Sequence, residues 1–157
     1  MANSIRQQIM VAVVSSLTNV TTDNGYQTDV EFVSENIKHF AELDNDKFPA
    51  LFPIDTDETK ESFTFRDSAT AQDMKSTLTV LVTSYLYSRT GVTVQARSDL
   101  LRDVEKAMMN ATAMTTMANI YDIRPMKVTT DQGTVENYSI HDQEIQIDYT
   151  YNHADGG

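Results

Sequence analysis

The chain has 157 residues, of which 40% are hydrophobic, as expected for one folded domain that buries a real core. It contains no cysteine, which excludes disulfides, thiolate metal sites and cysteine nucleophiles. The net charge of −11 and the scattered basic residues argue against a protein that grips a nucleic-acid backbone.

No apolar run approaches the roughly 18 residues that a bilayer-spanning helix needs. At the N-terminus, Arg6, Gln7 and Gln8 stand where a secretory signal would be apolar. We therefore expect a protein without membrane contact that stays in the cytoplasm until it is assembled into something larger.

The first predicted element is an amphipathic helix from Ser4 to Leu17, capped by Asn3 or Ser4. Its apolar stripe repeats every four residues: Ile5, Ile9, Val13 and Leu17. Val11 and Val14 lie off this stripe, so the helix carries more apolar surface than one contact requires.

A turn at Asn24-Gly25 precedes an alternating segment, residues 28–34, that predicts a half-buried strand. Residues 35–47 are polar with isolated apolar positions, which fits either a short helix or an ordered loop. Residues 50–54 then form a short apolar run flanked by prolines and acidic residues, typical of a loop that leads into a short buried strand.

The longest predicted strand covers Met74 to Tyr87. Its core face carries Leu78, Val80, Val82 and Leu86, and its other face carries Thr77, Thr79, Leu81, Thr83, Tyr85 and Tyr87. The second face, rich in threonine and tyrosine, suits a surface covered by a helix or by another subunit.

A second helix is predicted from Ser98 to Asn110. Asp131-Gln132-Gly133 indicates a hairpin turn between strands at 126–130 and 135–139, and residues 144–151 alternate as a closing strand. Residues 152–157 are expected to fray. The prediction is one α+β domain, 1–157, with a mixed, mostly antiparallel sheet and two helices packed on it.

Catalytic and metal-binding patterns are absent from the sequence. His39, His141 and His153 are far apart and are interpreted as structural or surface residues, with His141 in a loop. No phosphate-binding glycine loop or zinc motif is present. The acidic clusters at 44–46 and 55–58 lack the glycine and distal glutamate of a calcium loop. We therefore expect no enzyme activity, cofactor or metal.

Three apolar patches exceed what a small core uses, which predicts contacts between copies of the chain. The candidate interface residues are Val11, Val14, Phe63, Phe65, Leu81, Tyr85 and Tyr87.

The order of elements, with the sharper segments 21–30 and 46–55 and the closing Tyr149-Thr150-Tyr151, resembles the tail-terminator and head–tail joining proteins of long-tailed bacteriophages. The resemblance implies a six-fold ring in the virion that caps the tail tube, ends tail elongation and presents a surface to the head connector. Its partners would be copies of itself, the tube protein and the connector, with DNA as passing cargo.

Alternatives remain within and outside that assembly. A head-completion or tail-tube protein would share the same build, and a small soluble enzyme or an adaptor belongs to a different class. If DNA passes through the ring, acidic side chains are expected to line the channel, since like charge keeps phosphates from sticking. The candidates are Asp44, Asp46, Asp55, Asp57 and Glu58, which would otherwise face solvent outside.

Overall fold

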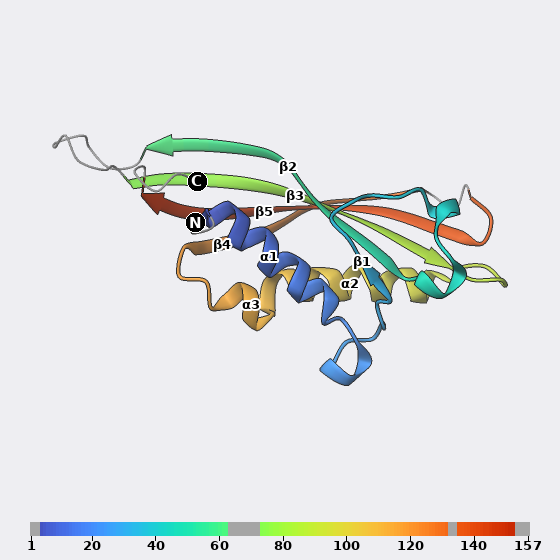
Figure 1. The fold of residues 1–157 in the computed structure, drawn as a ribbon. Helices are drawn as coiled ribbons and strands as arrows, with labels where there is room; N and C mark the ends of the chain where they lie inside the picture. Colours follow the sequence, from blue (N-terminus) through green and yellow to red (C-terminus); the bar gives the residue numbers. More distant parts are fainter. Residues whose placement is uncertain (1–3, 63–72, 132–134, 153–157) are drawn as a thin grey trace.

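The computed structural model describes residues 4–62, 73–131 and 135–152. Its elements, in chain order, are α1 (Ile5–Thr18), β1 (Phe32–Val33), β2 (Ala50–Ser62), β3 (Asp73–Tyr87), α2 (Val94–Asn110), α3 (Thr112–Thr115), β4 (Ile120–Thr130) and β5 (Tyr138–Asn152). The strands form one sheet in the order β1-β2-β3-β5-β4, and the three helices lie on one of its faces (Figure 1). The predicted α+β class with a mixed sheet is confirmed.

The central strand β3 pairs antiparallel with β2 on one side and with β5 on the other, over nearly its whole length. β4 extends the antiparallel sheet beyond β5. β1 is the one parallel strand among the described residues, and it meets β2 only at Ala50 and Leu51. Within the described residues, the outer side of β2 beyond Leu51 and the outer side of β4 have no strand partner and are open edges.

The first helix begins where the sequence predicts. Ser4 Oγ accepts a hydrogen bond from the Gln7 amide at 3.2 Å, and Gln7 Oε1 accepts one from the Ser4 amide at 2.8 Å. This reciprocal capping box satisfies two backbone donors that a helix start otherwise leaves unpaired. The second helix starts four residues earlier than predicted, because Thr93 Oγ1 caps it by accepting from the Ala96 amide at 3.1 Å.

The main core lies between the helices and the sheet. The face of β3 that the alternation assigned to the core supplies fully buried side chains, and α1 and α2 pack over them. Fully buried members include Ile9, Val13, Leu17, Leu78, Val80, Val82, Leu100, Val104, Met108 and Ile147.

A second, aromatic cluster lies on the other face of the sheet, at the end where β2 begins. Phe52 and Tyr85 lie 5.3 Å apart between ring centroids, and Phe40 contacts Tyr85 edge-on at 6.2 Å. Phe40 belongs to residues 35–47, for which the sequence pattern fits either a short helix or an ordered loop. That segment is an ordered loop with two short 3-10 turns, at Phe40–Glu42 and Asn45–Lys47, and Phe40 and Leu43 pack it against the aromatic cluster on the sheet.

Four boundary predictions are wrong. The strand predicted at residues 28–34 shrinks to β1, which pairs in parallel with β2. β2 continues past Ile54 to Ser62, because β3 offers an antiparallel partner along that length. β4 begins at Ile120 rather than at residue 126, and β5 is one strand where two were predicted, since both follow the long β3–β5 ladder.

Candidate functional site

A polar network joins the first turn of α1 to β2. β2 has a bulge between Asp55 and Asp57, which adds one residue to its side of the ladder. In a regular strand, residues three apart point to opposite faces. The bulge instead places Asp55 and Glu58 on the same face, across from Val80 and Leu78, where Arg6 reaches both.

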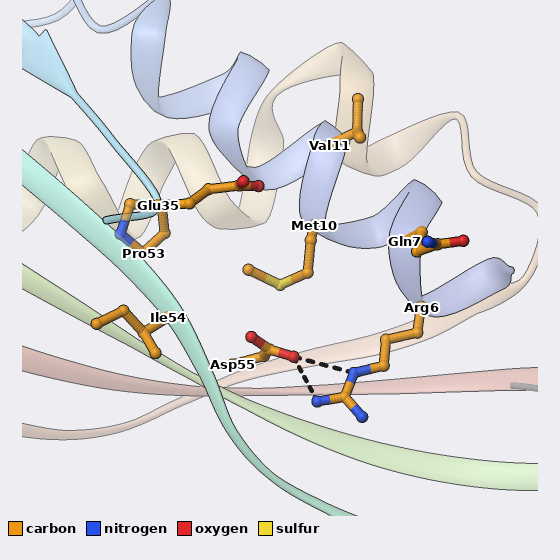
Figure 2. A pocket seen from close by; sticks show the side chains of 8 residues that line it. All are labelled: Arg6, Gln7, Met10, Val11, Glu35, Pro53, Ile54 and Asp55. Carbon is orange, nitrogen blue, oxygen red and sulfur yellow. Dashed lines mark hydrogen bonds and ion pairs between the residues drawn. The ribbon is translucent and has the colours of Figure 1, made fainter. Parts of the chain in front are cut away.

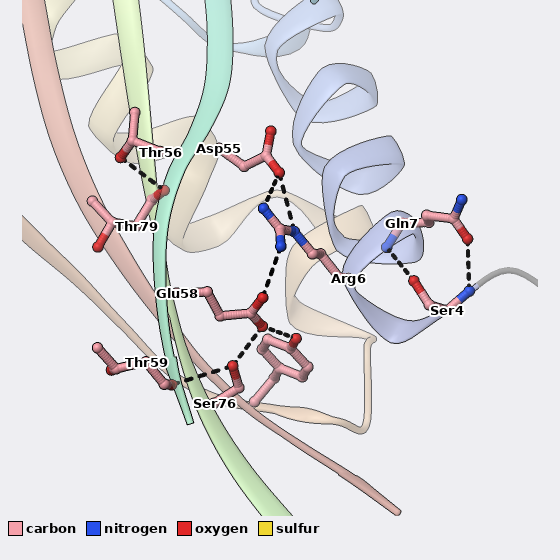
Figure 3. A network of polar contacts seen from close by, with 10 residues as sticks. Ser4, Arg6, Gln7, Asp55, Thr56, Glu58, Thr59, Ser76 and Thr79 are labelled. Carbon is pink, nitrogen blue, oxygen red and sulfur yellow. Dashed lines mark hydrogen bonds and ion pairs between the residues drawn. The ribbon is translucent and has the colours of Figure 1, made fainter. Parts of the chain in front are cut away.

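Arg6 Nε donates to Asp55 Oδ2 at 3.0 Å and Nη1 donates to Glu58 Oε2 at 2.9 Å, while Nη2 also contacts Asp55 (Figure 3). The hydrogen bond to Asp55 is the main cause that raises the pKa of Arg6, and burial works against it. A guanidinium held by two carboxylates from one strand fixes the start of α1 against the sheet.

Glu58 is the most connected group of this network. Its side chain is 7% exposed, and its Oε1 accepts hydrogen bonds from Ser76 Oγ at 2.5 Å and from the Tyr149 hydroxyl. Burial, and then the hydrogen bond to Glu58, raise the pKa of Tyr149. Every oxygen of the Glu58 carboxylate already has a donor, so the group acts as a structural clamp and not as a general base.

A second network lies on the opposite face of the sheet. Asp148 accepts from Thr77 Oγ1 at 2.6 Å and from both terminal nitrogens of Arg124, which also donates to Asp122 at 2.7 Å. Burial alone would raise the pKa of Asp148, but these hydrogen bonds hold it below its usual value. This network ties β3, β5 and the edge strand β4 together.

His141 lies inside β5, so its predicted place in a loop is wrong. Its Nε2 is 2.6 Å from Ser139 Oγ, and both residues are buried at 1% and 2% exposure. Burial, and then the charge of Arg97, lower the pKa of His141 to about 4. A serine–histidine pair closed off from solvent has no access to substrate, which leaves a packing role for it.

The predicted interface residues differ in their exposure to solvent in the structure. Val11 is 60% exposed, whereas Val14, Leu81 and Tyr87 are half-buried. The half-exposed surface predicted at Tyr85 is wrong, because this side chain is only 6% exposed. Phe40 and Phe52 of the same chain cover it. Phe63 and Phe65 lie outside the described residues.

The predicted acidic lining residues lie on different faces of the sheet and differ in their exposure to solvent. Asp44 and Asp46 are exposed on the loop that precedes β2, and Asp57 is exposed on the helix-free face of the sheet. Asp55 and Glu58 belong to β2 instead of a loop, and both are paired with Arg6 on the helix-bearing face. The sequence could not reveal this, since a bulge has no signal in a run of alternating polar residues.

The exposed apolar residues of β4 were not among the predicted interface residues. Tyr121, Met126 and Val128 are each about half exposed, at 51%, 52% and 51%. The segment 120–130 does contain the signal, because its apolar residues and Pro125 fit an edge strand with one apolar side. Tyr121 packs against the Lys75 ammonium, 5.6 Å from its ring centroid, whereas Met126 and Val128 lie near the other end of this edge strand.

An open groove of about 370 Å³ lies between α1 and β2 (Figure 2). Met10 and Val11 of α1 and Pro53 and Ile54 of β2 give it apolar walls, and Glu35 lies at its margin.

Among the described residues, no group of three or more histidine, aspartate or glutamate side chains could hold a metal ion. No helix in the described ranges is long and apolar enough to cross a membrane.

Comparison with known proteins gives no match to a protein-family model or to a curated sequence. The function proposed below is therefore inferred from the geometry of the chain and from the resemblance described above. It offers two structural networks, two open sheet edges and apolar surfaces on both lateral sides.

Replacing Glu58 with glutamine should lower the free energy of unfolding by about 1–3 kcal/mol, since the charge-assisted bond to Arg6 is lost in a partly buried place. Urea unfolding followed by circular dichroism measures this. The matched control is Glu61→Gln on the same strand, whose carboxylate is 66% exposed and 3.6 Å from Lys75. The control should change stability by no more than about 0.5 kcal/mol. Equal effects of the two variants would contradict the clamp role of Glu58.

His141 should make the protein less stable as the pH falls from about 6.5 to about 4. In that window the unfolded histidine binds a proton and the folded one does not, so folding must expel it. The expected slope is at most about 1.4 kcal/mol per pH unit. His141→Gln should remove this part of the pH dependence in urea unfolding, whereas His39→Gln, which retains His141, should keep it. An unchanged slope in His141→Gln would refute the assignment.

Proposed function

We propose that this protein is a structural ring subunit of a bacteriophage tail, and specifically a tail terminator. The observation that carries the ring is the difference between the two lateral sides of one sheet. One side presents Val11 beside the β2 edge, and the other presents Met126 and Val128 on β4. Two different apolar sides favour head-to-tail contacts between copies. Such contacts close into a ring when the rotation that relates one copy to the next divides a full turn.

The step from a ring to a tail terminator rests on the resemblance of the chain to that family. Its helix, long strand, second helix over the sheet and closing strand occur in the expected order. A terminator blocks the addition of further tube subunits through contacts alone and needs no reactive groups. In this proposal the ring contains six copies, sits in the virion between tail tube and head connector, and lets DNA pass.

The part of the helix-free face that lies beyond the aromatic cluster is the proposed channel lining. On it carboxylates outnumber cations: Asp57, Glu61, Asp122, Asp142, Glu144 and Asp148 stand against Lys75, Arg124 and Lys127. Threonines fill much of β3 between them. A hydrophilic face with excess negative charge would repel DNA phosphates, as a channel for passing DNA requires. Asp57 is the member of the predicted set that belongs to this lining.

Removal of the gene product is expected to give tails of uncontrolled length that do not join heads, seen by electron microscopy of lysates. Native mass spectrometry of the purified protein or of tail ends should give a six-subunit mass. Tails of normal length beside unattached heads would instead indicate a head-completion protein, the second member of the same assembly. Normal particles would exclude a tail role and leave the enzyme or adaptor alternatives.

The channel assignment is tested by the double variant Asp57→Lys and Glu144→Lys. Both positions face the proposed lumen, so the ring should still form while DNA ejection slows and infectivity falls by about tenfold or more. The matched control is Asp23→Lys and Glu31→Lys, two exposed positions that lie outside strands β2, β3, β4 and β5. Unchanged infectivity of particles that carry the first variant would overturn the assignment.

A further inference from the structure

A polar pocket of about 440 Å³ lies in the helix layer, between the last turns of α1 and α2 and the start of α3. A hollow of this size is typical of a site for a small molecule. The exposed residues Asn19, Asn24 and Asn110 contribute amide side chains to its lining. Among the described residues, none that lines this pocket also lines the groove between α1 and β2, so the two are distinct hollows.

Ser16 is a buried polar residue of this lining. It is 1% exposed, and its Oγ has no hydrogen-bond partner within the described part of the chain. A hydroxyl in a helix can donate back to a carbonyl of the preceding turn, as Thr18 Oγ1 does to Val14 at 2.7 Å. Because a buried hydroxyl without a partner is costly, a ligand oxygen that reaches Ser16 gains a hydrogen bond that the chain itself leaves unmade.

Lys106 brings a positive charge to the same lining. Its Nζ donates to the Gly25 carbonyl at 3.1 Å and lies 4.9 Å from the centroid of the Tyr26 ring. These contacts fix the ammonium at the pocket wall, and it makes no ion pair within the described ranges. An ammonium has three N–H donors, so donors remain for a ligand.

The described part of this lining contains no carboxylate, although the chain has a net charge of −11. The α1–β2 groove, in contrast, holds Glu35 and Asp55. Burial, and then the charge of Asp103, raise the pKa of Tyr26, so one acid acts on the pocket from behind its lining. That acid is bound within the chain, since its Oδ2 accepts from the backbone amides of residues 27 and 28 at 2.9 and 2.8 Å.

We propose that this pocket binds an oxyanion group, a carboxylate or a phosphate, of a small polar molecule. Lys106 supplies the charge, and Ser16 Oγ and the Asn110 amide donate hydrogen bonds to the anion oxygens. The polar lining favours a hydrophilic ligand over an apolar one. The site goes beyond the proposed ring and does not depend on it, because no strand contributes to the described lining.

Nuclear magnetic resonance of the full, deuterated and ¹⁵N-labelled chain tests the site. The protein is titrated with sodium phosphate and, separately, with sodium acetate, while sodium chloride keeps the ionic strength constant. Saturable shifts are expected at the backbone amides of residues 106, 110, 112 and 113, with a dissociation constant of about 1–10 mM. Saturation by phosphate alone assigns a phosphate group, saturation by acetate alone assigns a carboxylate, and saturation by both assigns the shared oxyanion chemistry.

Variants of the lining separate a site from general attraction of anions. Asn110→Asp puts a carboxylate into the pocket and leaves Lys106 and Ser16 in place, so binding should weaken about tenfold. Lys106→Gln should also weaken it about tenfold, and Ser16→Ala about threefold. The matched control is Lys127→Gln, an exposed lysine of β4 outside the pocket, which should bind as the unchanged chain does.

Three results would overturn the site. The first is the absence of a saturable shift with either anion. The second is a set of shifts that grow linearly or that appear equally around lysines outside the pocket. The third is unchanged binding in Asn110→Asp, in a protein whose spectrum shows that it is folded.

Discussion

The alternation of side chains along β3 is the constraint on which most of this structure depends. β3 sits in the centre of the sheet, and its even-numbered positions from Leu78 to Leu86 fill the core beneath both helices. Its odd-numbered positions carry threonines and Tyr85 on the opposite face. Because a strand has a period of two, a shift of one residue would move the apolar side chains to the helix-free face and place the threonines beneath the helices. Both neighbouring strands take their register from this one.

The departures from regular pairing are as informative as the ladder. The bulge in β2 brings Asp55 and Glu58 to one face, where Arg6 links them to α1. Without the extra residue, one of the two carboxylates would point away from the helix. The helix position and the strand irregularity therefore form one arrangement, stabilised by charge-assisted hydrogen bonds at a partly buried site.

The buried ionisable groups and the exposed apolar side chains of this domain occupy different places in the fold. Its buried ionisable groups include Glu58, Asp103, Asp148 and His141, and each of them contacts other groups of the chain. Of the exposed apolar side chains, Val11 lies beside β2 and three lie on β4, and the others lie on the loop before β2 and on α2: Ile37, Val94 and Met109. The proposed function builds on a sheet with one helix-covered face, one face that is aromatic at one end and polar beyond it, and two unlike lateral sides.

The sequence by itself determined the elements whose signal is local and periodic. The stripe of α1, its Ser4 cap and the two faces of β3 follow from spacing alone, and the α+β class follows from their order. Tertiary structure decided the rest. Phe40 covers Tyr85 because a loop folds back over the sheet, which no local pattern encodes. The bulge that pairs Asp55 and Glu58 with Arg6 depends on β3 and α1, distant in sequence, since only pairing with a partner strand defines an extra residue.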